Sequence, residues 1–195
     1  MTASSKASPY DTTPPPRPAS DATADIATVL FQAEDGFPLR GTLYVNETNP
    51  GPAILLSSAA AVRREHYGHF AEAAVAAGAA AVLTYDYRGV GGSAVPADWS
   101  GSVAMADWGV NDMAGAVLLL RRLFPGRPLA GIGQSIGGTM LGLCRHRTAF
   151  SRYAMVGSAN GYLGFTDEKL RLFLAMNLIG VPASRLLGVV PAWLG

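Results

Sequence analysis

The chain has 195 residues, of which 49% are hydrophobic and 15% are charged, and its formal net charge is +1. This composition excludes an intrinsically disordered protein and predicts a globular domain with a sizeable core. The near-zero charge gives no case for a nucleic-acid partner, because such proteins carry a basic surface. The single cysteine, Cys144, excludes an internal disulfide and is typical of a reducing compartment, so we expect a cytoplasmic protein.

Both ends of the chain differ in composition from its middle. Residues 1–25 are rich in Ala, Ser, Thr and Pro and predict a disordered tail. They lack the apolar segment that a signal peptide needs. The apolar C-terminal stretch is interrupted by Arg171, Pro182 and Arg185, so we expect no integral membrane segment.

After the tail, the chain reads as a hairpin followed by alternating strands and helices. Strand-like patterns over 26–32 and 39–45, with Asp35-Gly36 between them, predict the hairpin. Four short apolar runs predict buried parallel strands over 53–57, 80–85, 129–132 and 153–156. Helical patterns fill the gaps, over 65–77, 107–124 and 136 to about 145. This order predicts an α/β fold with a mostly parallel sheet and helices on both of its faces.

One stretch of this pattern carries a chemical signal, Gly133-Gln134-Ser135-Ile136-Gly137. It lies between a predicted strand and a predicted helix, which is the context of the G-x-S-x-G nucleophile elbow. A serine on such a sharp turn presents its hydroxyl at the top of a sheet, and the glycines let strand and helix approach closely. Ser135 is therefore the predicted nucleophile, and the backbone amide of Ile136 is a predicted oxyanion donor.

The same glycines allow a dinucleotide-binding interpretation. Gly131-Ile132-Gly133 followed by Gly137 resembles a loosened G-x-G-x-x-G fingerprint. That fingerprint requires an acidic residue at the end of the next strand, where it binds the ribose. The next predicted strand ends in Val156-Gly157-Ser158, which contains no acid, so this interpretation is disfavoured.

Three further segments give the chain a resemblance to a known family. They match the D-x-R-G-x-G-x-S loop after the fourth strand, the oxyanion loop after the third strand, and the start of the helix before the elbow strand. In this sequence they are Asp86-Tyr87-Arg88-Gly89-Val90-Gly91-Gly92-Ser93, Ser57-Ser58-Ala59-Ala60-Ala61 and residues 108–112. From about Phe31 onward the chain resembles an alpha/beta-hydrolase, closest to the bacterial serine aminopeptidase and lysophospholipase-like branch.

The resemblance implies a serine hydrolase that cleaves an ester, thioester or amide of a small-molecule substrate through an acyl-enzyme on Ser135. It also implies a second oxyanion donor in the loop after the third strand. For this donor we choose the backbone amide of Ala59, with Ala60 as the alternative. No cofactor and no metal are implied. Asp86 and Arg88 are expected to form a structural pair that shapes their loop.

The resemblance also implies an acid and a histidine that follow the serine in the chain. The one histidine after Ser135 is His146, which would lie on the nucleophile's own helix, ~16 Å away at a rise of ~1.5 Å per residue. His66 and His69 are predicted to be surface side chains. Asp167 is the candidate acid, at an unusual position for the family.

Six strands are predicted, whereas the complete fold of the family has eight. We therefore expect a core over 26–160, the start of a helical cap over 161–195, and two further strands, with the acid and histidine, beyond this sequence. The alternative function is a non-catalytic protein of the same fold that binds a hydrophobic ligand or partner. A stable short form would need to cover its exposed sheet edge, for instance as a homodimer.

Overall fold

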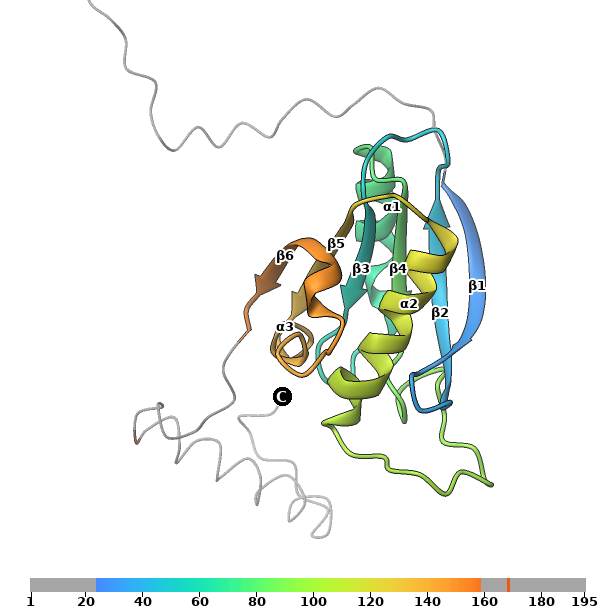
Figure 1. Cartoon of the computed structure of the whole chain (residues 1–195), viewed down its shortest axis with the longest axis vertical. Coiled ribbons are helices and arrows are strands. Elements are labelled where there is room, and N and C mark those ends of the chain that lie inside the picture. The colour runs from blue at the N-terminus through green and yellow to red at the C-terminus, as the bar shows by residue number, and fades with distance from the viewer. Residues whose placement is uncertain (1–23, 159–167, 169–195) are drawn as a thin grey trace, which may run out of the picture. The chain divides into compact units, whose positions relative to one another are not determined.

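The computed structural model describes residues 24–158 and 168 (Figure 1). The chain divides after Ser158 into two units, and the elements described below belong to the first. The predicted cap over 161–195 and the candidate acid Asp167 lie outside the described residues, apart from residue 168, which is helical and exposed.

Six strands form one sheet in the order β1-β2-β4-β3-β5-β6. The first two strands form an antiparallel hairpin, and β2 also pairs antiparallel with β4. The other neighbours are parallel. The bounds are β1 (Asp25–Gln32), β2 (Pro38–Val45), β3 (Ala53–Ser57), β4 (Ala81–Tyr85), β5 (Leu129–Gln134) and β6 (Phe150–Val156). The predicted hairpin and mostly parallel sheet are confirmed, although β6 begins earlier than its apolar run indicated.

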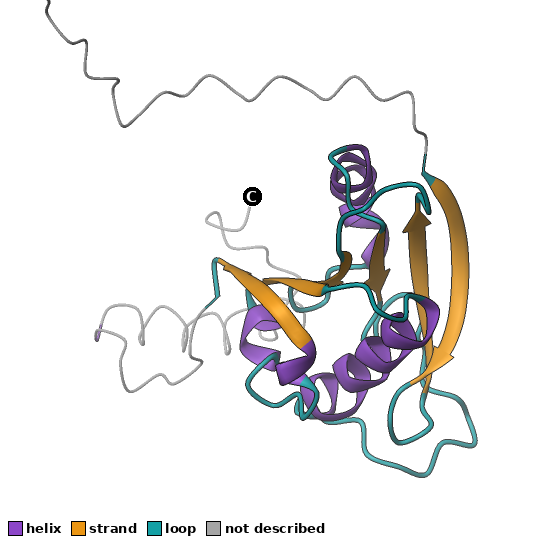
Figure 2. Ribbon diagram, turned by 45° about the horizontal axis from the view of Figure 1, so that its top comes forward, coloured by secondary structure: helices purple, strands orange, loops and turns teal. Residues whose placement is uncertain are grey.

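The helices cover both faces of this sheet (Figure 2). Their bounds are η1, a 3-10 turn (Arg64–Tyr67), α1 (Gly68–Ala76), η2, a π-helical turn (Trp108–Asp112), α2 (Met113–Leu123), α3 (Ile136–Met140) and η3, a 3-10 turn (Arg147–Ala149). In the part of the chain from 24 to 158, no helix has both the length and the apolar character needed to cross a membrane.

The helix after the elbow is shorter than predicted. It ends at Met140 and not near residue 145. The next amides bond back three residues, from Leu141 to the carbonyl of Gly138 and from Gly142 to that of Thr139, as in a tight 3-10 turn. Gly137 and Gly138 within the helix and Gly142 just after it explain the early end, because glycine is among the weakest helix formers.

Alternate residues of the central strands enter two separate cores, as strand geometry requires. Leu55 of β3 packs toward the core that contains α2, whereas the next residue, Leu56, packs toward α1. The buried face of α1 consists of Ala71 and Val75. Since β3 is covered on both faces, its carboxyl end is held rigidly, and the loop after it starts from a fixed point.

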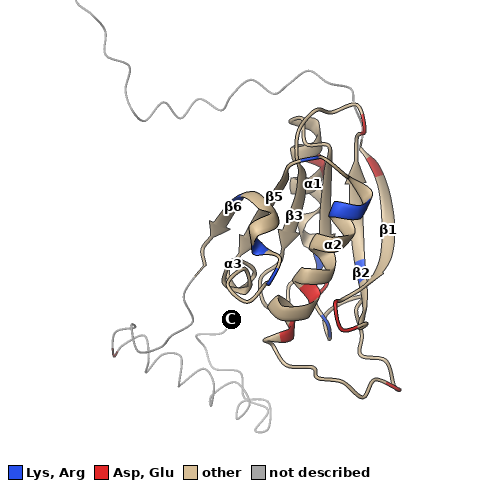
Figure 3. Ribbon diagram, in the orientation of Figure 1, with Lys and Arg blue, Asp and Glu red and all other residues tan. Residues whose placement is uncertain are grey.

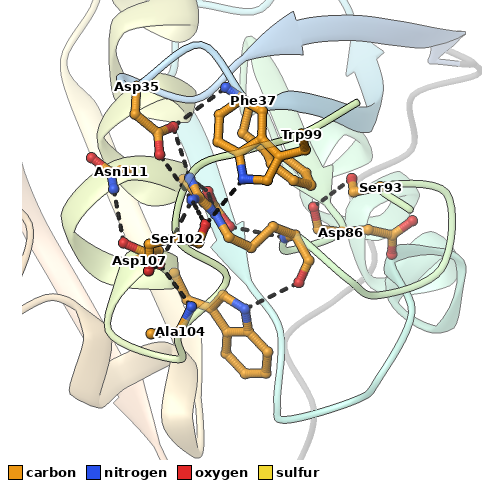
Figure 4. Close-up of polar contacts among 12 residues, drawn as sticks. Asp35, Phe37, Asp86, Ser93, Trp99, Ser102, Ala104, Asp107 and Asn111 are labelled. Carbon is orange, nitrogen blue, oxygen red and sulfur yellow. Dashed lines mark hydrogen bonds and ion pairs between the residues drawn. The ribbon is translucent and has the colours of Figure 1, made fainter. Parts of the chain in front are cut away.

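A buried arginine joins the hairpin to the loop after β4 and to the start of α2. Arg88 is 1% exposed, and its guanidinium contacts Asp35 at 2.8 Å and Asp112 at 2.7 Å, with Asp107 at 3.7 Å. Figure 4 shows Asp35 and Asp107, whose carboxylates both contact the guanidinium of Arg88. The acidic colouring of the β1–β2 turn and of the start of α2 in Figure 3 marks the two segments that this arginine holds.

The expected pair of Asp86 and Arg88 does not form. Asp86 instead pairs with Arg64, accepting hydrogen bonds from its guanidinium and from its backbone amide at 2.7 Å. Asp86 also accepts a bond from the amide of Gly92 at 2.8 Å. Both side chains form ion pairs, but with partners from different elements, Asp86 with Arg64 of η1 and Arg88 with Asp35 and Asp112.

Replacing Arg88 with methionine should destabilise the fold by about 3–5 kcal/mol, because the buried carboxylates of Asp112 and Asp35 would lose their countercharge. Urea unfolding would measure this loss. The matched control is Arg121→Met, on an exposed position of α2, with an expected change within about 0.5 kcal/mol. Equal effects of the two substitutions would contradict the central role of Arg88.

Asp112 should make stability depend on pH. Burial raises the pKa of Asp112 from 3.8 to about 6, and the hydrogen bonds from Arg88 limit this rise. Between these values the folded chain retains a proton that the unfolded chain has released, so the unfolding free energy falls as pH rises through this window. Urea unfolding between about pH 4 and 7 should show this fall in the wild type and its absence in Asp112→Asn. Parallel pH profiles for the two proteins would refute the assignment.

Candidate active site

Ser135 lies on a strained turn between β5 and α3. Its backbone has φ 51° and ψ −119°, a conformation that non-glycine residues rarely adopt and that costs roughly 1–3 kcal/mol. The amide of Ser135 donates to the carbonyl of Val156 at 2.9 Å, which ties the turn to β6. The residue is exposed at the carboxyl end of the parallel strands. The strand–turn–helix geometry predicted for the motif is therefore present.

The two glycines of the motif are required by backbone contacts. A Cβ atom on Gly133 would lie 2.4 Å from the amide nitrogen of Gly138, at the start of α3. A Cβ atom on Gly137 would lie 2.2 Å from the carbonyl oxygen of Ser57, at the end of β3. Neither contact can be relieved by rotating a side chain, because both involve backbone atoms. The elbow therefore depends on direct backbone packing of α3 against β5 and β3.

The first predicted oxyanion donor is at the start of α3. Ile136 is the first residue of this helix, so its amide has no acceptor within the helix. Tyr153 supports the same turn from β6, since its hydroxyl donates to the carbonyl of Gly137 at 3.1 Å. Burial raises the pKa of Tyr153 to about 12, so this hydroxyl stays protonated and remains a donor.

The second predicted donor, Ala59, is already engaged. Its amide donates to the hydroxyl of Tyr67 at 3.0 Å. The next amide, that of Ala60, has no hydrogen-bond partner among the described residues. Ala61 then takes φ 58°, the left-handed region that L residues rarely adopt. The loop is thus strained at one residue, and the alternative donor Ala60 has an amide without a partner among the described residues.

Tyr67 is a site residue that the sequence patterns did not reveal. Besides accepting from Ala59, its hydroxyl donates to the side-chain oxygen of Gln134 at 2.6 Å, one residue before Ser135. Tyr67 and Gln134 also line a cavity of about 270 Å³, together with Leu56, His66, Phe70, Ile132 and Val156. A tyrosine at the start of a helix carries no motif, so no local signal marks it.

The three histidines of the sequence all lie in the described part, and none is hydrogen-bonded to Ser135. His69 is exposed, as predicted, and its ring lies 3.9 Å from the carboxylate of Glu72. His146 bonds Glu34 at 3.1 Å. Burial and the charge of Arg145 lower the pKa of His146. His66 is exposed, as predicted, but also lines the cavity beside Gln134.

No group of three or more His, Cys, Asp or Glu side chains within residues 24–158 is arranged to hold a metal ion.

The predicted position of His146 was wrong. The prediction placed it on the nucleophile's helix, whereas that helix ends at Met140 and His146 precedes η3.

No protein-family model matches the chain, and no curated protein matches it either. Several solved structures, however, are similar to this chain. DcsB in complex with its substrate analogue aligns with a TM-score of 0.60 and 23% identity, over 86% of this chain and 56% of DcsB. A thermostable carboxyl esterase from Bacillus coagulans aligns with a TM-score of 0.59 and 19% identity, over 80% and 51%. The alpha/beta hydrolase GrgF from Penicillium sp. sh18 aligns with a TM-score of 0.54 and 24% identity, over 86% and 57%.

The chain therefore spans little more than half the length of these similar structures. The strand order, the elbow between β5 and α3, and these alignments agree with one another. This chain has the alpha/beta-hydrolase fold.

Proposed function

We propose that this chain carries the nucleophile of a serine hydrolase that cleaves an ester, thioester or amide of a small-molecule substrate. The observation that carries the proposal is the backbone of Ser135, held at φ 51° between two glycines that allow no side chain. Such strain persists where the surrounding structure imposes it, and it is concentrated at functional sites. The solved structures of the same fold include a carboxyl esterase, which is compatible with this proposal.

In the proposed reaction, the hydroxyl oxygen of Ser135 adds to the substrate carbonyl carbon while its proton passes to a base. The negative oxygen that forms accepts hydrogen bonds from the amides of Ile136 and Ala60, each contributing roughly 3 kcal/mol. Collapse of this intermediate releases the leaving group, which takes the proton, and leaves an acyl ester on Ser135. Water then repeats the addition and frees the acid. We favour Ala60 over Ala59 here because the Ala59 amide is already bonded to Tyr67.

The base is proposed to be a histidine outside this sequence, oriented by an acid. His69 and His146 are paired with Glu72 and Glu34, which supports this choice. His66 is the remaining histidine of the sequence, and it lines the cavity beside Gln134. It is therefore the residue to test for a base within the described chain.

The second candidate is a non-catalytic protein of the same fold that binds a hydrophobic ligand or partner. The observation that favours it is that none of the chain's three histidines bonds Ser135. A binding protein would keep the fold and the cavity without needing a reactive serine. The two candidates differ in one measurable property, the reactivity of the Ser135 hydroxyl.

The test is intact mass spectrometry of the native protein before and after treatment with a fluorophosphonate, which forms a covalent bond with activated serine hydroxyls. We expect one adduct per chain in the wild type and none in Ser135→Ala, because the probe needs an activated oxygen at this position. The rate of adduct formation should rise with pH as the base loses its proton.

Two variants serve as controls. Ser100→Ala removes an exposed serine of the loop after β4 and should label as the wild type does. His66→Asn should also label normally, and loss of labelling would identify His66 as the base. A natively expressed wild-type protein that is folded and stays unlabelled would contradict the hydrolase and favour the binding protein, whereas the 195-residue sequence by itself would lack the proposed base.

A further inference from the structure

A single hydroxyl connects the two strained turns of the candidate site. Tyr67 is the last residue of η1 and is 9% exposed. Its oxygen accepts the amide proton of Ala59 at 3.0 Å and gives its own proton to Gln134 at 2.6 Å. The loop after β3 and the end of β5 are thereby joined at one atom, by contacts that span 8 and 67 residues of sequence.

The loop after β3 needs such an anchor. Ala61 holds a left-handed conformation that alanine disfavours, and conformations of this kind persist only when neighbouring contacts over-determine them. Beyond the strained residue, the loop is fixed where the amide of Arg64 donates to Asp86 at 2.7 Å. Around it, the amide of Val62 donates to the carbonyl of Ala59 at 3.2 Å, and Ala59 is in turn held by the bond of its amide to Tyr67. Removing the hydroxyl would free Ala59, the residue on which this turn around Ala61 is closed.

The same hydroxyl also contacts the nucleophile elbow, through its bond to Gln134. Gln134 is the residue before Ser135, and the amide of Ser135 is held by Val156 at 2.9 Å. The bond from Tyr67 therefore fixes the side chain that precedes the nucleophile, while its other bond fixes the peptide that precedes the amide of Ala60. The nucleophile and the loop donor are set relative to each other through this one side chain.

We propose that Tyr67 is a positioning residue of the hydrolytic site, whose hydroxyl holds the oxyanion loop and the nucleophile elbow in register. This role rests on the proposed function of Ser135. Tyr67 transfers no proton to or from the substrate. Its effect is on the distance between the hydroxyl of Ser135 and the loop amide, and small misplacements of such groups reduce rates strongly.

The test is the kinetics of fluorophosphonate labelling in Tyr67→Phe. We expect the maximal labelling rate constant to fall about 10- to 100-fold while the concentration for half-maximal rate changes little, because the lost hydroxyl orients the reacting groups and does not bind the probe. Measurement well below the melting temperature of each protein separates this effect from unfolding, since a merely stabilising hydroxyl would lower the melting temperature and leave the rate constant unchanged.

The matched control is Tyr87→Phe, which removes another buried tyrosine hydroxyl, one that has no hydrogen-bond partner in the described structure. It should label as the wild type does. Gln134→Met removes one end of the contact, and the double variant with Tyr67→Phe should label no more slowly than Tyr67→Phe alone, because both changes act on the same bond.

The outcomes separate the two proposals. A wild type that labels, with a Tyr67→Phe variant that labels at the same rate, overturns the positioning role and leaves the hydrolase intact. Additive losses in the double variant also overturn it, since they would mean that Tyr67 and Gln134 act independently. A folded wild type that does not label overturns the proposed function and, with it, the role of Tyr67.

Discussion

The candidate site depends on the close approach of backbone atoms at Gly137. At this position the first turn of α3 lies against the carbonyl of Ser57 with no room for a Cβ atom, and Gly133 makes the equivalent approach to α3 from β5. Because β3 and β5 are neighbours in the sheet, these two contacts fix α3 at their shared carboxyl end. Ser135 must then bridge strand and helix in one residue, and its positive φ is the result.

A second constraint is the set of ion pairs that Arg88 makes in the loop after β4. The guanidinium of Arg88 is shared among carboxylates from the hairpin turn and from the start of α2, so the long loop after β4 leaves the sheet in a defined direction. Asp86, two residues earlier, holds the start of η1 through Arg64. The ion pairs of Arg88 hold the loop after β4, whereas the backbone packing at Gly137 holds α3 against β3, so the two constraints act on different elements.

Much of the fold could be predicted because its signals are local. Short apolar runs bounded by turn residues identify β3 and β4, and the G-x-S-x-G spacing identifies the elbow because Gly133 serves a contact with Gly138 nearby in the sequence. The contact of Gly137 with Ser57, by contrast, is distant in sequence and is set by the pairing of β3 with β5. The end of α3 at Met140 was missed because the apolar pattern continues beyond it, while the glycines shorten the helix. The pairing of Asp86 with Arg88 was wrong for a related reason: proximity in sequence does not decide which buried charge meets which.

The sequence by itself determined the strand–turn–helix at Ser135 and the parallel sheet that presents it, because these follow from periodicity and from the few residues that tolerate positive φ or close approach. The tertiary structure alone decided that Arg88 meets Asp35, 53 residues away, and that Tyr67 meets Gln134, 67 residues away. It also decided that the Ala59 amide is bonded to Tyr67, while the Ala60 amide has no partner within the described part of the chain. Such contacts form only when the complete fold brings residues far apart in the sequence close together, and a local sequence pattern does not specify which of them will meet.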